Sequence, residues 1–192
     1  MDILKRSVGA CLLNLTGWTF EKDFVWQDKQ VVVGFPHTSN MDGVRTLFMF
    51  PQLGIDAHFL IKKELFRWPF SSLLTYMGGV PITRGQKKNQ VELIAEEFKK
   101  RDEFTLALAP EGTRTKGNDE IPPIKTGFWH IARLAGVPIV LMMSDNKNKR
   151  CKFLRSIQPG DDMDQGLKDI QEIYRAEGVE IKIPEPGAKK PS

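Results

Sequence analysis

Apolar residues follow two different spacings along the chain, and each spacing predicts a type of secondary structure. Short β-branched or apolar runs are typical of buried strands, whereas apolar residues three and four positions apart are typical of helices. The pattern predicts strands at 30–35, 57–61, 80–85, 104–109, 137–143 and within 146–158, and helices at 1–16, 42–53, 69–77, 88–100, 127–134 and 164–177. Because strands and helices alternate, we expect an α/β fold, a single domain with a central mixed sheet flanked by helices.

Composition narrows the class of protein without identifying it. The 192 residues suit one domain that is long enough to bury a core, and the two cysteines, Cys11 and Cys151, belong to no CxxC pair. With no zinc-ligand spacing and no disulfide framework, we expect no bound metal and a reducing, cytosolic setting. The net charge of +4 favours anionic partners, but it does not choose among nucleic acid, phosphate-bearing small molecules and anionic lipid surfaces.

The first twenty residues combine a basic start with an apolar run. Lys5 and Arg6 precede an uncharged stretch of fourteen residues that ends in aromatic side chains. As a helix this stretch would be about 21 Å long, shorter than the roughly 30 Å of hydrocarbon that a spanning helix crosses. We therefore expect an N-terminal amphipathic helix on a membrane surface, with an ordinary core or surface helix as the alternative. The predicted segments are 1–20 (membrane-associating), 21–183 (the α/β domain) and 184–192 (a flexible tail).

His37 and Asp42 follow the predicted strand at 30–35 and are the first candidates for chemistry. If His37 lies in the loop after the strand and Asp42 in the first turn of the next helix, the carboxylate can meet the imidazole Nδ1–H and orient Nε2 as a base. Because no dedicated protein nucleophile lies nearby, this base would most simply deprotonate a hydroxyl group of the substrate. The alternative is structural, since Ser39 and Asp42 also fit a helix capping box.

Two further polar segments follow predicted strands. Arg84 ends the segment GVPITR, and Glu111, Arg114 and Lys116 crowd the loop APEGTRTKG after the strand at 104–109. The guanidinium group matches the geometry of phosphate, so Arg84 and Arg114 are candidate phosphate ligands. Glu111 would then orient a substrate hydroxyl or hold Arg114 in place. Solvent-exposed surface charges are the alternative interpretation of both segments.

Taken together, the order of these segments resembles the glycerolipid acyltransferase family, the PlsC-like 1-acyl-sn-glycerol-3-phosphate acyltransferases. The H-x4-D block of that family is similar to 37–42, and its apolar block ending in Arg is similar to 80–84. Its P-E-G-T-R and V-P-I-V blocks match 110–114 and 137–140 letter for letter. The resemblance covers about 31–143.

This resemblance implies an acyl transfer and a role for each matching residue. His37, oriented by Asp42, removes the proton of an acceptor hydroxyl, and the alkoxide attacks the thioester of acyl-CoA or acyl-ACP. Lys63, in the stretch IKKEL that also resembles the family, is the candidate that stabilises the oxyanion. The substrate-binding candidates are Ser39, Arg84, Glu111, Gly112, Thr113 and Arg114. Neither a metal nor another cofactor is expected.

The most direct expectation is an O-acyltransferase of phospholipid biosynthesis that converts lysophosphatidate to phosphatidate. It would be peripheral and monotopic at the cytoplasmic face of the cell membrane, bound to an anionic lipid surface and not to nucleic acid. Pro81 and Thr115 depart from the family pattern, so another lysophospholipid or a lipidated amino acid is an alternative acceptor. A non-catalytic membrane- or phosphate-binding module is the alternative of a different class. A serine hydrolase is disfavoured because no G-x-S-x-G elbow is present.

Overall fold

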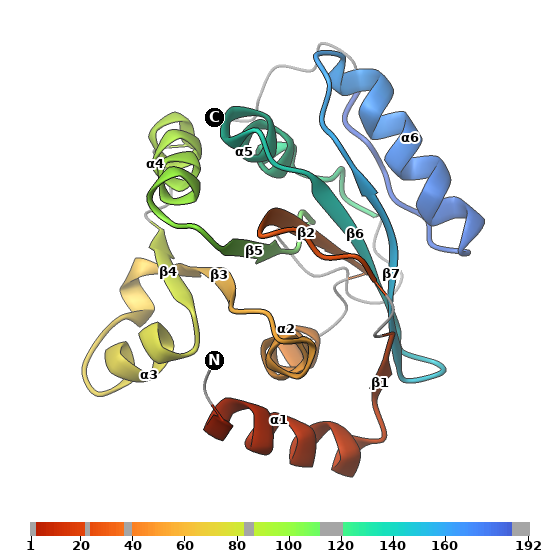
Figure 1. Cartoon of the computed structure of the whole chain (residues 1–192). Coiled ribbons are helices and arrows are strands. Elements are labelled where there is room, and N and C mark those ends of the chain that lie inside the picture. The colour runs from red at the N-terminus through yellow and green to blue at the C-terminus, as the bar shows by residue number, and fades with distance from the viewer. Residues whose placement is uncertain (1–2, 22–23, 37–39, 83–86, 112–120, 186–192) are drawn as a thin grey trace.

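The computed structural model describes residues 3–21, 24–36, 40–82, 87–111 and 121–185, and within these residues its centre is a seven-stranded mixed sheet (Figure 1). The strands are β1 (Thr19–Phe20), β2 (Lys29–Phe35), β3 (Ala57–Lys62), β4 (Gly79–Ile82), β5 (Phe104–Leu108), β6 (Ile139–Asp145) and β7 (Arg150–Ile157). They lie in the order β1-β7-β6-β2-β5-β3-β4. Neighbouring strands are parallel apart from β6 and β7, which pair antiparallel.

Helices cover both faces of this sheet (Figure 1). They are α1 (Ile3–Thr16), α2 (Asn40–Met49), α3 (Phe70–Tyr76), α4 (Lys87–Lys100), α5 (Gly127–Ala135) and α6 (Met163–Ala176), with 3₁₀ turns η1 (Phe50–Leu53) and η2 (Lys63–Leu65). α1 and α2 lie on one face and α4, α5 and α6 on the other, while α3 lies at the edge of the sheet beside β4. The predicted fold class, a mixed sheet flanked by helices, is confirmed.

Successive residues of the central strand β2 explain why both faces are covered. Val31 and Val33 are buried among side chains of α4, α5 and α6, whereas Val32 is buried with Leu13 of α1 and Phe50 of η1. Successive side chains of a strand point to opposite faces, so a strand covered on both sides is a continuous apolar run. β2 therefore lies between two hydrophobic cores.

The structure follows the predicted elements and differs from them in two places. The helix predicted at 42–53 ends as an α-helix at Met49 and continues as η1, because Pro51 has no N–H to donate to an α-helical hydrogen bond. Strand β1 was not predicted. Two residues are too few to show a periodicity, and Thr19–Phe20 is a strand because β7 pairs with it.

The N-terminal segment is joined to the rest of the domain by packing and by sheet pairing. Leu13 and Trp18 are buried. At Gly9 an added Cβ would lie 2.7 Å from the carbonyl oxygen of Phe48, so the residue must be small for α1 and α2 to approach this closely. Among the described residues, no helix combines the length and the apolar character needed to cross a membrane.

Gly166 of α6 lies against the indole ring of Trp129 from α5, and a Cβ at this position would overlap the ring. We therefore expect Gly166→Ala to lower the free energy of unfolding by about 1–3 kcal/mol, because overpacking outweighs the gain in helix propensity. Thermal unfolding followed by circular dichroism measures this. Gly127→Ala in α5 is the matched control, because no atom lies within 4 Å of its Cβ position. Equal melting temperatures for Gly166→Ala and wild type would contradict this packing.

Candidate active site

Four parallel strands lie side by side in the order β2-β5-β3-β4, and their carboxyl ends share one edge of the sheet (Figure 1). The pairing places one residue of each strand at the same level, namely Val32, Ala107, Phe59 and Gly79. Ligands of α/β sheets bind beyond the carboxyl edge, between the segments that follow the strands. This edge is therefore where the polar blocks of the sequence should meet.

Each candidate block follows the common level after nearly the same number of residues. In the sequence, Glu111 and Lys63 come four residues after it, and His37 and Arg84 come five residues after it. The four parallel strands thus end at one edge of the sheet, and each leads in the sequence toward one of these positions.

Part of the candidate set lies outside the described residues. This applies to His37, Ser39, Arg84 and Gly112–Arg114, and also to the side chain of Asp42, whose backbone is in the first turn of α2. Glu111, three residues after the end of β5, is described and is only 7% exposed. A carboxylate is costly to bury without a partner, so this burial argues against a solvent-exposed turn at Glu111.

Lys63 lies at the same edge but is exposed. It is the first residue of η2 and directly follows β3. The two other histidines lie elsewhere, since His58 is near the amino end of β3, with Nε2 2.8 Å from Nη1 of Arg101, and His130 is in α5. In the described part of the chain, no group of three or more His, Cys, Asp or Glu side chains is arranged to hold a metal ion.

The end of β2, which leads to His37, is held by a tyrosine of the last helix. The Tyr174 hydroxyl lies 2.9 Å from the carbonyl oxygens of both Val33 and Met142, on the neighbouring strands β2 and β6. Its ring packs edge-on against Phe35, with 4.8 Å between the ring centres. Burial raises the pKa of the Tyr174 hydroxyl well above its usual value, so the group stays neutral and keeps its proton for donation.

The helix that carries Asp42 is held by a second set of contacts. The Arg45 guanidinium of α2 lies 4.1 Å from the ring centre of Trp18 and donates a hydrogen bond of 2.9 Å to Oδ1 of Asn146. These contacts join α2 to the N-terminal segment and to the turn between β6 and β7. We did not identify Arg45 or Tyr174 from the sequence, because their partners are 101 and up to 141 residues away and no local pattern marks them.

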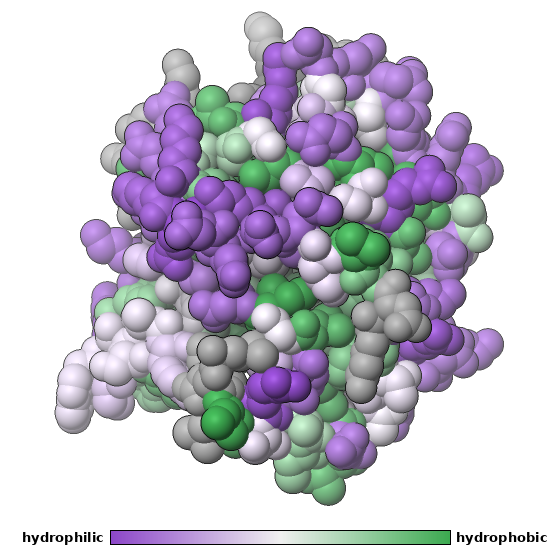
Figure 2. Space-filling model, in the orientation of Figure 1, coloured by the Kyte–Doolittle hydropathy of each residue, from purple (hydrophilic) through white to green (hydrophobic). Residues whose placement is uncertain are grey.

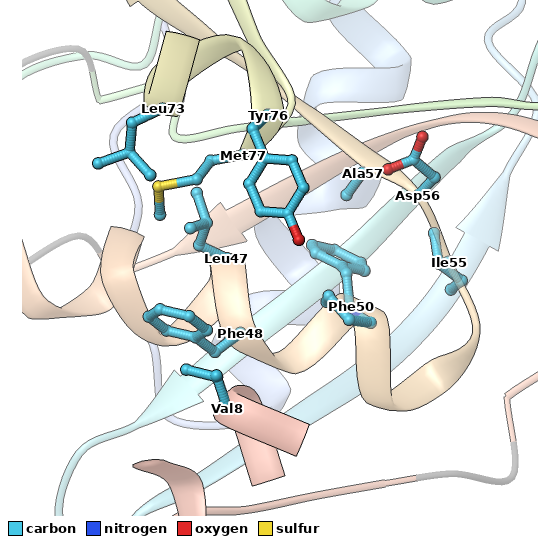
Figure 3. Close-up of a pocket in the computed structure, with 11 residues that line it drawn as sticks. Val8, Leu47, Phe48, Phe50, Ile55, Asp56, Ala57, Leu73, Tyr76 and Met77 are labelled. Carbon is cyan, nitrogen blue, oxygen red and sulfur yellow. The ribbon is translucent and has the colours of Figure 1, made fainter. Parts of the chain in front are cut away.

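An apolar pocket of about 230 Å³ lies between α1, α2 and α3 (Figure 3). Val8 of α1, Phe48 of α2 and Leu73 and Tyr76 of α3 line it from three sides. The other lining residues are Leu47, Phe50, Pro51, Ile55, Asp56, Ala57 and Met77. Walls of this composition suit a hydrocarbon chain better than a charged group.

Comparison with known proteins points to one family. A family model described as Acyltransferase matches residues 19–144. A 1-acyl-sn-glycerol-3-phosphate acyltransferase of Helicobacter pylori is 32% identical over 144 residues, which are 72% of this chain and 60% of that protein. A protein of the same name from Escherichia coli is 39% identical over 93 residues, which are 46% of this chain and 37% of that protein. The chain thus spans less than two thirds of the length of either curated relative.

The fold also has a counterpart among solved structures. The crystal structure of a 1-acyl-sn-glycerophosphate acyltransferase, PlsC, from Thermotoga maritima matches with a TM-score of 0.66. The match covers 96% of this chain and 79% of that one. At 17% sequence identity, this likeness shows a shared fold.

The Tyr174 contacts predict a measurable loss of stability when the hydroxyl is removed. We expect Tyr174→Phe to lower the free energy of unfolding by about 1–3 kcal/mol, because buried carbonyl groups of β2 and β6 lose a donor that water cannot replace. Denaturation in urea, followed by circular dichroism, measures the difference. Tyr76→Phe is the matched control, because Tyr76 is 42% exposed whereas Tyr174 is fully buried. An unchanged midpoint for Tyr174→Phe would show that these hydrogen bonds contribute nothing net.

Proposed function

Because the chain belongs to the acyltransferase family, we propose that it transfers a fatty acyl chain from a thioester to the free hydroxyl of lysophosphatidate, forming phosphatidate. One observation carries the proposal: the strands that lead to His37, Glu111, Lys63 and Arg84 are parallel neighbours that end at one edge of the sheet. The names of the H. pylori and E. coli relatives support this acceptor, with alignments that span 60% and 37% of those proteins.

In this mechanism His37 is the general base and then the general acid. The acceptor hydroxyl gives its proton to Nε2 of His37 while its oxygen attacks the carbonyl carbon of the thioester. The tetrahedral intermediate collapses, the C–S bond breaks, and the imidazolium returns the proton to the leaving thiolate. Asp42, in the first turn of α2, orients the imidazole and stabilises its charged form. The products are the acylated acceptor and the free thiol of CoA or ACP.

The order of the strands separates the roles of the charged residues. Neighbouring strands lie about 4.8 Å apart, so β5, which leads to Glu111 and Arg114, is one spacing from β2. β4, which leads to Arg84, is three spacings away, or about 14 Å. We therefore assign the acceptor phosphate first to Arg114 and second to Arg84. The remaining assignments are Lys63 to the oxyanion and Ser39, Glu111, Gly112 and Thr113 to the glycerol part of the acceptor.

We assign an acyl chain of the substrates to the apolar pocket between α1, α2 and α3. α2 carries Asp42 at its start and lines the pocket with Leu47 and Phe48 near its end. At a rise of about 1.5 Å per residue, Asp42 and Phe48 are separated by about 9 Å along the helix axis. One helix therefore links the proposed base to a site that accepts hydrocarbon. The mechanism uses no metal or other cofactor, and acyl-CoA or acyl-ACP serves as the donor.

A different acceptor is the second candidate, and Pro81 favours it. Pro81 is exposed in β4, the strand that leads to Arg84, and it departs from the family pattern there. Thr115, next to the P-E-G-T-R block, departs as well. Both changes adjoin residues assigned to the acceptor and leave the base unchanged, so the chemistry would be the same on another lysophospholipid or a lipidated amino acid.

We also propose a peripheral, monotopic placement at the cytoplasmic face of the membrane, with α1 on an anionic lipid surface. One side of α1 packs on the domain through Gly9 and Leu13. Val8, Leu12 and Leu15, spaced four and three residues apart, are exposed and form what we term the α1 row. A short exposed apolar row beside basic residues suits the boundary between headgroups and acyl chains.

Replacing the proposed base should abolish most of the activity. We expect His37→Ala to lower the rate of thiol release from a long-chain acyl-CoA with lysophosphatidate by about 10²–10⁴-fold, the usual contribution of a general base. His130→Ala is the matched control, because His130 lies in α5 and not after a strand of the site. Equal rates for His37→Ala and wild type would overturn the assignment of the base.

A panel of lysophospholipids in the same assay separates the two candidate acceptors. Repeating the assay with acyl-ACP in place of acyl-CoA compares the rates with the two donors.

The α1 row predicts a loss of membrane binding when charge is added to it. We expect Leu12→Glu/Leu15→Glu to weaken sedimentation with anionic liposomes by about tenfold or more, because two apolar contacts are replaced by carboxylates that the surface repels. Leu93→Glu is the control, because Leu93 is similarly exposed but lies in α4 on the other face of the sheet. Undiminished sedimentation of the double variant would refute the role of α1.

A further inference from the structure

Exposed apolar side chains concentrate in one short segment beside the apolar pocket. Nine large apolar side chains of the described residues are more than half exposed, and four of them lie within 65–73. These four are Leu65, Trp68, Phe70 and Leu73, which we term the α3 ridge. Trp68 is 92% exposed, the highest value of this set. Such a cluster of exposed apolar residues marks an interaction surface.

The α3 ridge has little contact with the core of the domain. No residue of α3 is buried, and the helix lies at the edge of the sheet beside β4 (Figure 1). The segment that leads into it, between η2 and α3, exposes Trp68 and Arg67 together. The ridge is thus a projecting apolar surface and not a groove that could receive a helix or strand.

The α3 ridge and the α1 row meet at the same pocket. Val8 belongs to the α1 row and Leu73 to the α3 ridge, and both line the apolar pocket between the two helices (Figure 3). In the space-filling view, pale and green side chains are more frequent over α1 and α3, whereas purple side chains crowd the upper part over α4 and α6 (Figure 2). The two exposed surfaces therefore adjoin the same pocket from two sides.

Basic side chains adjoin these two surfaces. Lys63 and Arg67 are exposed within and just before the ridge, against the single acidic residue Glu64 in the same stretch, and Arg6 is exposed on α1. Tryptophan and basic residues together are typical of segments that lie at the headgroup level of a bilayer, where the indole is partly buried and the cation meets lipid phosphate. The positive charges and the exposed tryptophan thus fit an anionic lipid surface.

We propose that the α3 ridge is a second membrane contact, which acts with α1 so that the protein sits on an anionic bilayer through two elements, with Trp68 and Phe70 inserted at the headgroup level. This inference rests on the proposed function, in which the acceptor is a membrane lipid. Its consequence is orientation: two separated contacts fix the tilt of the domain, and the pocket between them faces the lipid.

Vesicle binding and tryptophan fluorescence test this contact directly. We expect Trp68→Glu/Phe70→Glu to bind vesicles of phosphatidylcholine and phosphatidylglycerol about tenfold or more weakly than wild type, with an unchanged melting temperature because both side chains are exposed. Leu134→Glu, on α5, is the matched control for adding charge at an exposed leucine. Vesicles should also shift wild-type emission to the blue, and Trp68→Phe should bind similarly while losing most of that shift.

Activity on a short-chain, fully water-soluble lysophosphatidate separates this inference from the proposed function. We expect Trp68→Glu/Phe70→Glu to keep wild-type kcat/KM on this acceptor and to lose activity on acceptor embedded in vesicles. Wild-type vesicle binding by the double variant would overturn the second contact and leave the function intact. No activity of the wild type on any acceptor, with the Trp68 shift present, would overturn the function and leave the contact. A dimer that the double variant dissociates, with vesicle binding unchanged, would assign the ridge to self-association and overturn the inference.

Discussion

The parallel pairing of β2 with β5 on one side and β6 on the other is the constraint on which the rest of the structure depends. Parallel neighbours cannot be joined by tight turns, so the chain must cross over between them, and helices come to cover both faces of the sheet. The same pairing aligns the carboxyl ends of β2, β5, β3 and β4. This pairing alone brings strand ends that are far apart in the sequence to one edge of the sheet, and no specific side-chain contact is needed for it.

Two long-range contacts then hold the ends of the segment that runs from β2 into α2. Tyr174 donates to the main chain near the end of β2, and Arg45 ties α2 to Trp18 and Asn146. Both contacts come from packing and hydrogen bonding outside the proposed reacting groups. They explain how β2, which leads to the proposed base, and α2, which carries its proposed partner, have a defined relative position.

The N-terminal helix combines packing against the domain with exposed apolar side chains, two properties that the sequence analysis treated as alternatives. α1 buries Leu13 and approaches α2 closely at Gly9, and it also exposes Leu12 and Leu15. A helix has two sides, and here one side packs on the domain while the other stays available. Since α1 also forms a wall of the apolar pocket, anything it binds is placed next to α2 and hence close to the site. The proposed acceptor, a lipid with a charged end and an apolar chain, is consistent with an edge that carries Lys63 and Glu111 and an apolar pocket lined by α2.

The sequence by itself determined the class of fold, nearly all of the helices and strands, and the blocks that carry the proposed chemistry. These features are local: β2 is an apolar run, α4 and α6 have helical spacing, and the blocks at 37–42 and 110–114 are contiguous letters. Only the tertiary structure decided the order of the strands, the existence of β1, and the burial of Glu111. It also decided the roles of Tyr174 and Arg45 and the pocket between α1 and α3. Each of these depends on groups brought together across many residues, and periodicity along a chain carries no information about which distant segment will lie alongside.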